Sequence, residues 1–329
     1  MVSPFDSDDT VAPNDTALTT SIGETFTVPA LTFSGTAPIV TWVLYDENGV
    51  DQSVQLSSTT GTASRTGIAL TSGLWRLQAT AQYAAGTQVV SRSIRVSDGR
   101  VCDFTSLAAG VWTTATSNTL AGLSWTKTGT GTATIGPTGV VCTGSTNQPV
   151  SLAVPLSTAF ADYDGRSDVI DVVVSLAAAP TLVGTNDAVV VRWSDASTPT
   201  DYIDVSMVYT AAANIFATAG GSTGGTTFNA GNTGASLWTG GTPKHLWVTL
   251  REGEVTLRGS ADATLPALTE ISWTDRFHFR VAPTTAYNAT TYRRNATYMG
   301  TGDYLTIIAR RSSAGSTMTI ARCAITRRN

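Results

Sequence analysis

The sequence predicts an all-β protein that is built from two sandwiches. Threonine, serine, alanine, glycine and valine fill short alternating runs, and only 13% of the residues are charged. β-Branched side chains suit a pleated, half-buried surface and lose χ1 freedom in a helix, so this composition favours strands. At 329 residues, the chain exceeds the roughly 250–300 residues at which one hydrophobic core stops growing. Two domains are therefore expected.

The first domain is predicted over residues 16–98, after an acidic, proline-containing segment, residues 1–15, that is expected to form an extended arm. Strands are expected about ten residues apart, separated by turn signals such as Asp46-Glu47-Asn48-Gly49. Short strands with regular turns and no helical periodicity are typical of a sandwich. The expected strands are Thr25–Val28, Ile39–Tyr45, Ser53–Leu56, Leu74–Gln82 and Val89–Val96.

Two tryptophans in this region sharpen the prediction. Trp42 lies mid-strand, where it is expected to fill the space between two sheets. The run Gly73-Leu74-Trp75-Arg76-Leu77 alternates apolar and polar residues after a turn glycine. It resembles the sixth strand of an immunoglobulin-like domain, with Trp75 at the position of the corner tyrosine and Leu77 at that of the second disulfide cysteine. The resemblance implies an immunoglobulin-like sandwich of the bacterial or phage style, without the antibody-type disulfide.

The second domain is predicted over residues 101–329, after the short polar boundary Ser97-Asp98-Gly99-Arg100. The segments Leu246–Leu250 and Val255–Arg258 are expected to form a hairpin with a glycine in its turn. About a dozen strands over this length favour two large packed sheets, a jelly roll. The expected strands are Val169–Leu176, Ala188–Trp193, Tyr202–Tyr209, His245–Leu250, Val255–Arg258, Phe277–Val281, Tyr304–Arg310 and Met318–Ile325. Their order resembles the concanavalin-A/laminin-G lectin-like superfamily, which implies a lectin-like sandwich.

The charge balance indicates that nucleic acid is not a partner. The formal net charge is -4, whereas a nucleic-acid-binding domain normally carries a basic stripe. The basic cluster near the C-terminus has two readings, a solvated strand face or an anchor to an acidic partner. No run of about 18 apolar residues occurs, and the N-terminus lacks a signal-peptide pattern. We therefore expect that the protein is synthesised in a cytoplasm and does not insert into a membrane. The basic cluster consists of Arg310, Arg311, Arg322, Arg327 and Arg328.

Aromatic side chains in two stretches are the candidate partner contacts. Trp238 ends the stretch Ala217–Gly241, which is rich in glycine, threonine and asparagine, carries Phe228 and is expected to be a loop. A large aromatic in such a loop needs a cover, which is its own domain, a neighbouring subunit or a ligand. Trp193 and Trp247 are expected in the core instead. A second stretch interleaves tyrosine and arginine, as contact surfaces do, with a hairpin packed on its own face as the alternative. Its candidate residues are Tyr287, Tyr292, Arg293, Arg294 and Tyr298.

No catalytic residue, metal site or cofactor is predicted. Asp162–Asp168 offers oxygens at alternate positions around a turn glycine, as a calcium loop does, but it lacks the bidentate glutamate and carries Arg166. Turn chemistry is therefore favoured there. Glu252 and Glu254, the close glutamate pair, fall on a hairpin turn, whereas a glycanase needs two carboxylates that face a cleft.

The histidines and cysteines give no chemical signature. His245 and His278 fall in expected strands with no nucleophile motif beside them. The three cysteines lack metal-ligand spacing and are expected as small buried side chains. A bridge between Cys102 and Cys323 stays open, and the third cysteine is Cys142.

Together these features resemble the accessory virion proteins of tailed bacteriophages. The resemblance implies a structural or adhesive virion component, such as a capsid decoration, head fibre, spike or tail-associated protein, assembled in the host cytoplasm. Its expected partners are other copies of itself, in a trimer, other virion proteins and host surface polysaccharide. The alternative is a carbohydrate-binding module or a lectin-like enzyme that cleaves glycans. We expect a protein that is not an enzyme.

Overall fold

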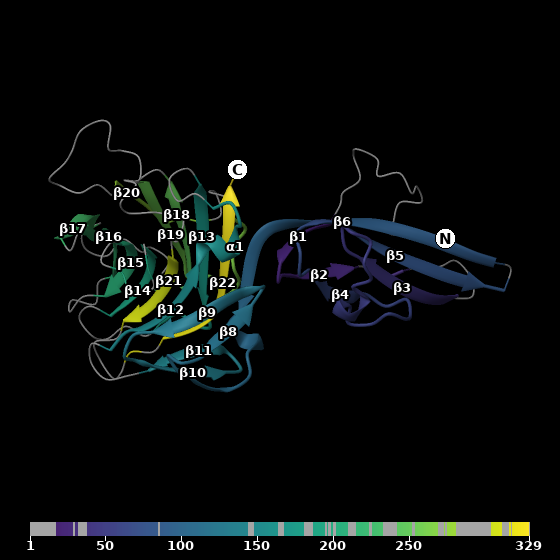
Figure 1. Ribbon diagram of the computed structural model, residues 1–329, viewed down its shortest axis with the longest axis horizontal. Helices are drawn as coiled ribbons and strands as arrows, with labels where there is room; N and C mark the ends of the chain where they lie inside the picture. The colour runs from purple at the N-terminus through teal and green to yellow at the C-terminus, as the bar shows by residue number, and fades with distance from the viewer. Residues whose placement is uncertain are drawn as a thin grey trace. The chain divides into compact units, whose positions relative to one another are not determined.

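The computed structural model divides the chain into two compact units, Met1–Val101 (unit 1) and Cys102–Asn329 (unit 2) (Figure 1). Most described residues lie in strands, and α1 (Leu156–Ala159) is the one α-helix among them. The predicted all-β fold is therefore confirmed. The residues described are 18–28, 30–31, 38–84, 86–143, 148–163, 168–180, 187–194, 196, 199, 202–209, 215–223, 226–232, 242–251, 254–268, 273, 275–280, 304–310, 316 and 318–328.

Unit 1 contains two sheets. In the larger one the order is β3-β5-β6-β1, with β1 parallel to β6 and the other neighbours antiparallel. In the smaller one β2 pairs antiparallel with β4. The strands are β1 (Leu18–Ile22), β2 (Thr25–Val28), β3 (Ile39–Tyr45), β4 (Arg65–Ile68), β5 (Gly73–Tyr83) and β6 (Gly86–Asp103).

The core of unit 1 is built around two tryptophans that the sequence analysis singled out. Trp42 is buried, its indole Nε1 donates to the carbonyl of Gly61 at 2.9 Å, and the Arg65 guanidinium lies 4.1 Å from its ring. Trp75 is fully buried, and its Nε1 donates to the carbonyl of Thr71 at 3.1 Å. Both indole N–H groups thus have acceptors, which removes the cost of burying them.

One local prediction for unit 1 was wrong. The expected strand Ser53–Leu56 is instead a 3-10 turn, η1 (Ser53–Gln55). The Asp51 carboxylate accepts from the backbone N–H of Ser53 at 2.8 Å and from its hydroxyl, and this local hydrogen bonding favours a turn over a strand. The polar stretch Ser97–Arg100, predicted as the domain boundary, lies inside β6, where pairing with Ser21 and Ile22 of β1 keeps it extended, and the division into two units falls directly after Val101.

Unit 2 is formed by two large sheets. One has the order β20-β19-β18-β13-β22-β11-β10-β7, and the other has the order β17-β16-β15-β14-β21-β12-β9-β8. The strands of the first are β7 (Gly110–Trp112), β10 (Thr132–Gly136), β11 (Gly139–Thr143), β13 (Val169–Leu176), β18 (His245–Arg251), β19 (Glu254–Ser260), β20 (Asp275–Arg280) and β22 (Met318–Arg328). Those of the second are β8 (Ser117–Leu120), β9 (Leu123–Thr128), β12 (Val150–Pro155), β14 (Ala188–Ser194), β15 (Tyr202–Tyr209), β16 (Ile215–Thr223), β17 (Thr226–Asn232) and β21 (Tyr304–Arg310).

A single hydrophobic cluster lies between these sheets. Val172 and Leu250 enter it from the first sheet, and Val191 and Ile307 enter it from the second, which makes unit 2 a sandwich. Trp193 is buried in this cluster, as predicted. The predicted hairpin is also confirmed, because β18 pairs with β19 along its whole length. All three cysteines are buried thiols, and no disulfide bond joins any two of them.

One prediction for unit 2 needs correction. Much of the stretch Ala217–Gly241, expected as a loop, is a hairpin of β16 and β17 that extends the second sheet from β15. Glycine and threonine give this stretch weak local signals, but continuous pairing with β15 fixes it as strand. Residues 233–241 lie outside the described residues.

Candidate functional site

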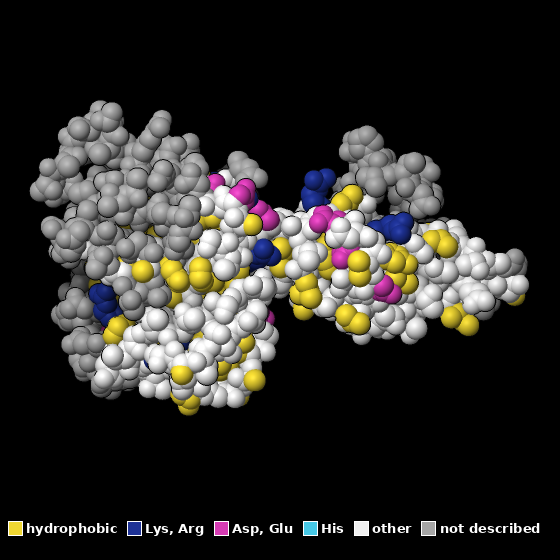
Figure 2. All heavy atoms as spheres, in the orientation of Figure 1, with side chains coloured by type: hydrophobic (Ala, Val, Ile, Leu, Met, Phe, Trp, Pro, Cys, Tyr) yellow, Lys and Arg dark blue, Asp and Glu magenta, His cyan; other side chains and the backbone are white. Residues whose placement is uncertain are grey.

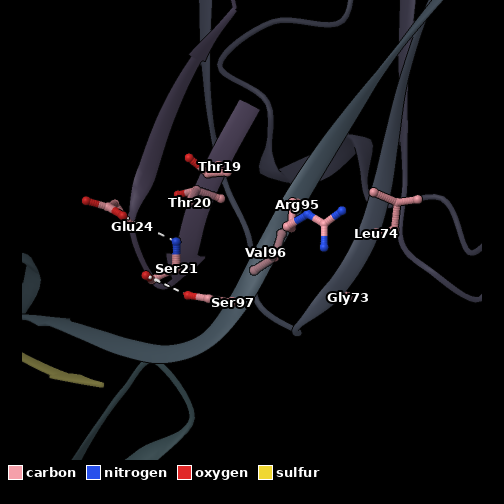
Figure 3. A pocket seen from close by; sticks show the side chains of 9 residues that line it. All are labelled: Thr19, Thr20, Ser21, Glu24, Gly73, Leu74, Arg95, Val96 and Ser97. Carbon is pink, nitrogen blue, oxygen red and sulfur yellow. Dashed lines mark hydrogen bonds between the residues drawn. The ribbon is translucent and has the colours of Figure 1, made fainter. Parts of the chain in front are cut away.

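A groove of about 620 Å³ lies on unit 1, between the edge strand β1 and the adjoining parts of β5 and β6 (Figure 3). We call it the Arg95 groove. Hydroxyl groups, one carboxylate and one guanidinium make up most of its polar lining, and Leu74 adds an apolar side chain. The lining residues are Thr19, Thr20, Ser21, Glu24, Gly73, Leu74, Arg95, Val96 and Ser97.

The register of the sheet positions Arg95 in the middle of the groove. On β6, Arg95 is directly opposite Leu74 of β5 on one side and Thr19 of β1 on the other. In Figure 3 its guanidinium points toward the side of Leu74 and away from Glu24. Arg95 forms no hydrogen bond or ion pair with another described residue. Within the described part of the chain, the guanidinium of Arg95 thus has no carboxylate partner.

Glu24 closes the end of the groove by folding back on β1. Its carboxylate accepts from the backbone N–H of Ser21 at 3.2 Å, and its own N–H donates to the carbonyl of Ser21 at 3.0 Å. Beside them the hydroxyl oxygens of Ser21 and Ser97 are 3.0 Å apart. Glu24 thus satisfies backbone groups at the edge of the sheet, a device that protects edge strands from further pairing.

Unit 2 carries a buried polar cluster on the face of β13 and β18 that points away from the main core. The Asp171 carboxylate accepts from Trp247 Nε1 at 2.9 Å and from Thr249 Oγ1 at 2.6 Å, and it pairs with Arg328. Arg258 donates to Thr249 Oγ1 at 3.1 Å and lies 4.2 Å from the Trp247 ring. We call this set the Asp171 cluster.

Trp247 is buried in the core, as predicted, in a second and smaller hydrophobic cluster. It packs edge-on against Trp273, with ring centroids 5.6 Å apart, in a small cluster with Val173 and Leu265. Trp273 in turn donates from Nε1 to the carbonyl of Ala267 at 3.0 Å. Leu265 and Trp273 therefore pack against this face of the sheet, and the Asp171 carboxylate is buried while Arg328 stays half-exposed.

A serine and a histidine that the sequence does not bring together meet on the same sheet. Ser175 and His245 are direct cross-strand neighbours, and Ser175 Oγ lies 2.9 Å from His245 Nδ1. Burial, followed by the nearby charge of Lys244, lowers the pKa of His245. Ser175 and His245 are only 7% and 4% exposed, so a substrate has no access to the pair. We interpret it as a cross-strand hydrogen bond.

Two arginines of the basic C-terminal strand β22, Arg327 and Arg328, pair with carboxylates of unit 2. Arg327 donates to Asp162 at 2.7 Å, lies 3.6 Å from Asp168 and stacks over the Phe160 ring. The hydrogen bond from Arg327 lowers the pKa of Asp162. Both end carboxylates of the predicted turn thus bind a guanidinium. Among the described residues, no group of three or more potential metal ligands occurs.

The structure also identifies an ion pair stacked on an aromatic ring that the sequence analysis missed. On the second sheet, Arg192 forms a two-pronged ion pair with Asp204 at 2.6 and 2.8 Å, and its guanidinium lies 3.8 Å from the Tyr202 ring. Arg192 and Asp204 are opposite each other on β14 and β15. Strand register brings them together, so no local motif signals the pair.

The predicted contact residues fall largely outside the described residues. Phe228 lies in β17, opposite Gly221, and its side chain is among the undescribed parts. The others, for which nothing follows from the structure, are Trp238, Tyr287, Tyr292, Arg293, Arg294 and Tyr298. The described chain has no helix with the length and apolarity required to cross a bilayer.

Comparison with known proteins gives structural similarities only. No protein-family profile matches the sequence, and no curated protein matches it. Lectin II from Ulex europaeus is similar with a TM-score of 0.40 and 9% identity, over 70% of this chain and 98% of the lectin. The exoplasmic/lumenal domain of VIP36, bound to Ca2+ and Man3GlcNAc, is similar with a TM-score of 0.37 and 10% identity, over 61% of this chain and 84% of that domain. The GH43 protein BlXynB from Bacillus licheniformis is similar with a TM-score of 0.36 and 10% identity, over 89% of this chain and 55% of that protein. Similarity at this level carries no argument about function.

Proposed function

We propose that this protein is a structural and adhesive component of a tailed-phage virion that binds partners and catalyses no reaction. The distribution of exposed apolar side chains is the main support. In unit 1 Val54 is 87% exposed and Ile39 is 70% exposed, whereas the large apolar side chains exposed on the described part of unit 2 are Val111 and Leu268. Clustered exposed apolar surface is typical of protein contact sites. The remaining ones on unit 1 are Val50, Ile68, Leu70, Leu74 and Val89.

Two of these side chains belong to one face of the larger sheet. Ile39 is opposite Gln82, and Val89 is opposite Thr80, two residues away on the same strand β5. Residues two apart on a strand share a face, so Ile39 and Val89 lie on the same face near the hairpin end of the sheet, with β5 between them. Apolar side chains appear at several places on the visible surface of this unit (Figure 2). We infer that unit 1 attaches the protein to its virion partner.

The proposal includes an immunoglobulin-like character for unit 1. Its first strand is parallel to its last strand, and Trp75 donates a hydrogen bond to the backbone four residues upstream, as the corner tyrosine of immunoglobulin-like domains does with its hydroxyl. A two-sandwich build with threonine-rich strands also suits a protein whose function resides in surface contact. Unit 2 is then the displayed part, with host surface polysaccharide as a further partner.

Attachment through unit 1 is tested by charging its exposed apolar side chains in the full chain. Ile39→Lys, Val54→Lys and Val89→Lys, combined, are expected to reduce by at least about tenfold the fraction that co-sediments with assembled particles, because a buried unpaired charge costs more than the lost apolar contact. The matched control is Val111→Lys with Leu268→Lys on unit 2, which is expected to incorporate normally. Normal incorporation of the unit 1 variant would refute attachment through this surface.

Self-association and the absence of catalysis are separate parts of the proposal. We expect a trimer, so sedimentation equilibrium at micromolar concentration should give three times the chain mass, and a monomer mass would remove this part. Release of reducing sugar from host polysaccharide, if lost in Glu252→Gln or Glu254→Gln, would establish the glycan-cleaving alternative. No such release is expected.

A further inference from the structure

We propose that the Arg95 groove binds a carboxylate-bearing sugar, such as a uronic acid residue of an acidic polysaccharide. The inference deepens the glycan-contact part of the proposed function and rests on it for biological context. It places that contact on unit 1, at the opposite end of the sheet from Ile39 and Val89, which are proposed for virion attachment. The two sites can therefore be altered independently.

The cation of the groove defines the charge of the ligand. Arg95 is exposed and forms no pair with another described residue, while its neighbour on the same face, Arg76, lies 5.0 Å from the Tyr45 ring. A guanidinium binds a carboxylate through two parallel hydrogen bonds, which adds geometric selectivity to the charge attraction. An unpaired arginine flanked by an apolar and a hydroxyl side chain is therefore suited to an organic carboxylate.

The remaining lining suits a polyhydroxylated ligand. Ser21 and Ser97 hold their hydroxyl oxygens 3.0 Å apart, and either one can donate. Such hydroxyls can donate to or accept from sugar hydroxyls, which also do both. Leu74 is 47% exposed beside Arg95 and offers an apolar surface to the C–H face of a sugar ring. The volume of about 620 Å³ lies within the roughly 300–1,000 Å³ of small-molecule sites.

Glu24 favours a sugar over an extended peptide. A peptide that added a strand to β1 would need the outward backbone groups of that strand, but those of Ser21 are already bonded to Glu24. The same carboxylate can accept from a sugar hydroxyl, and it repels a second carboxylate at that end of the groove. The ligand carboxylate is thereby directed to Arg95.

The test uses the full chain, titrated calorimetrically with trigalacturonate at low salt. Saturable binding is expected, and the neutral trisaccharide maltotriose should not bind. Arg95→Ala is expected to weaken binding by at least about tenfold, because a charge-assisted pair is lost. Arg95→Lys keeps the positive charge but cannot form two parallel hydrogen bonds, so its affinity should lie between those of the wild type and Arg95→Ala. Arg76→Ala removes a charge from the same face as a matched control and should leave the affinity unchanged.

Three outcomes would overturn the inference. One is no binding of trigalacturonate, and another is equal binding by the wild type and Arg95→Ala when circular dichroism shows both folded. The third is tighter, Arg95-dependent binding of poly-aspartate, which would assign the groove to an acidic peptide. The Lys substitutions at Ile39, Val54 and Val89 should leave sugar binding intact. Failure of the sugar site and failure of virion attachment are thus distinguishable.

Discussion

Replacing Asp171 by alanine is expected to destabilise unit 2 strongly. The carboxylate is 6% exposed and accepts from Trp247 Nε1 and Thr249 Oγ1. Without it, two buried donors lose their acceptor, at about 1–3 kcal/mol each. Arg328, whose side chain is 50% exposed, regains water and adds at most about 1 kcal/mol. The expected loss is therefore about 2–7 kcal/mol, mostly from the two buried donors.

Asparagine at the same position separates hydrogen bonding from charge. In Asp171→Asn the amide oxygen still accepts from Trp247 and Thr249, and only the ion pair with Arg328 is lost, so the cost should stay below about 2 kcal/mol. Hydrogen exchange of peptides from β13 and β18 across a urea series gives the stability of unit 2 separately from unit 1. Equal destabilisation by Asp171→Ala and Asp171→Asn would refute the assignment of the stability to the buried donors.

Three further perturbations follow from burial and backbone geometry. Burial lowers the pKa of His245, so the unfolded chain binds a proton on this histidine more readily than the folded protein does. The free energy of unfolding should therefore be constant above about pH 6.5 and decrease as the pH falls below that value. In thermal melts of His245→Asn, this decrease with falling pH should be smaller. Gly139→Ala places a methyl group against the carbonyl of Ile320 at a positive φ, whereas Gly122→Ala has only the φ penalty of about 1–2 kcal/mol. Denaturant midpoints should therefore fall further for Gly139→Ala, and equal shifts would contradict the clash. Burial also raises the pKa of Cys323, so Ellman's reagent should label no cysteine until the protein is denatured.

The strand pattern was predictable because local alternation and burial agree. Thr25–Val28, Ile39–Tyr45, Tyr202–Tyr209 and Tyr304–Arg310 coincide with β2, β3, β15 and β21, and each belongs to a paired strand. The strands that the sequence did not reveal, such as β16 and β17, are rich in glycine and threonine. Their state is decided by the neighbouring strand rather than by their own composition.

The candidate sites were less predictable because they depend on register between distant segments. Arg95 meets Thr19 across 76 positions of sequence only because β1 is parallel to β6, and Asp171 meets Trp247 and Arg328 by the order of β18, β13 and β22. Aromatic content drew attention to Trp247, but its burial on the far face of the sheet follows from pairing alone. A charge pattern along the chain gives no sign of which arginine will find a partner.

The pairing of arginines is the strongest argument for placing recognition on unit 1. In unit 2, Arg192 is paired with Asp204, Arg327 with Asp162, and Arg328 with Asp171. Each of these guanidinium groups already binds a carboxylate of its own unit. Breaking a part-buried ion pair costs more free energy than an exposed pair with a ligand returns. Arg95 lies in an open groove with flanking hydroxyls, and no carboxylate of the described residues pairs with it. An anionic ligand therefore gains a charge-assisted contact at Arg95, whereas at Arg192, Arg327 or Arg328 it must first displace an internal partner.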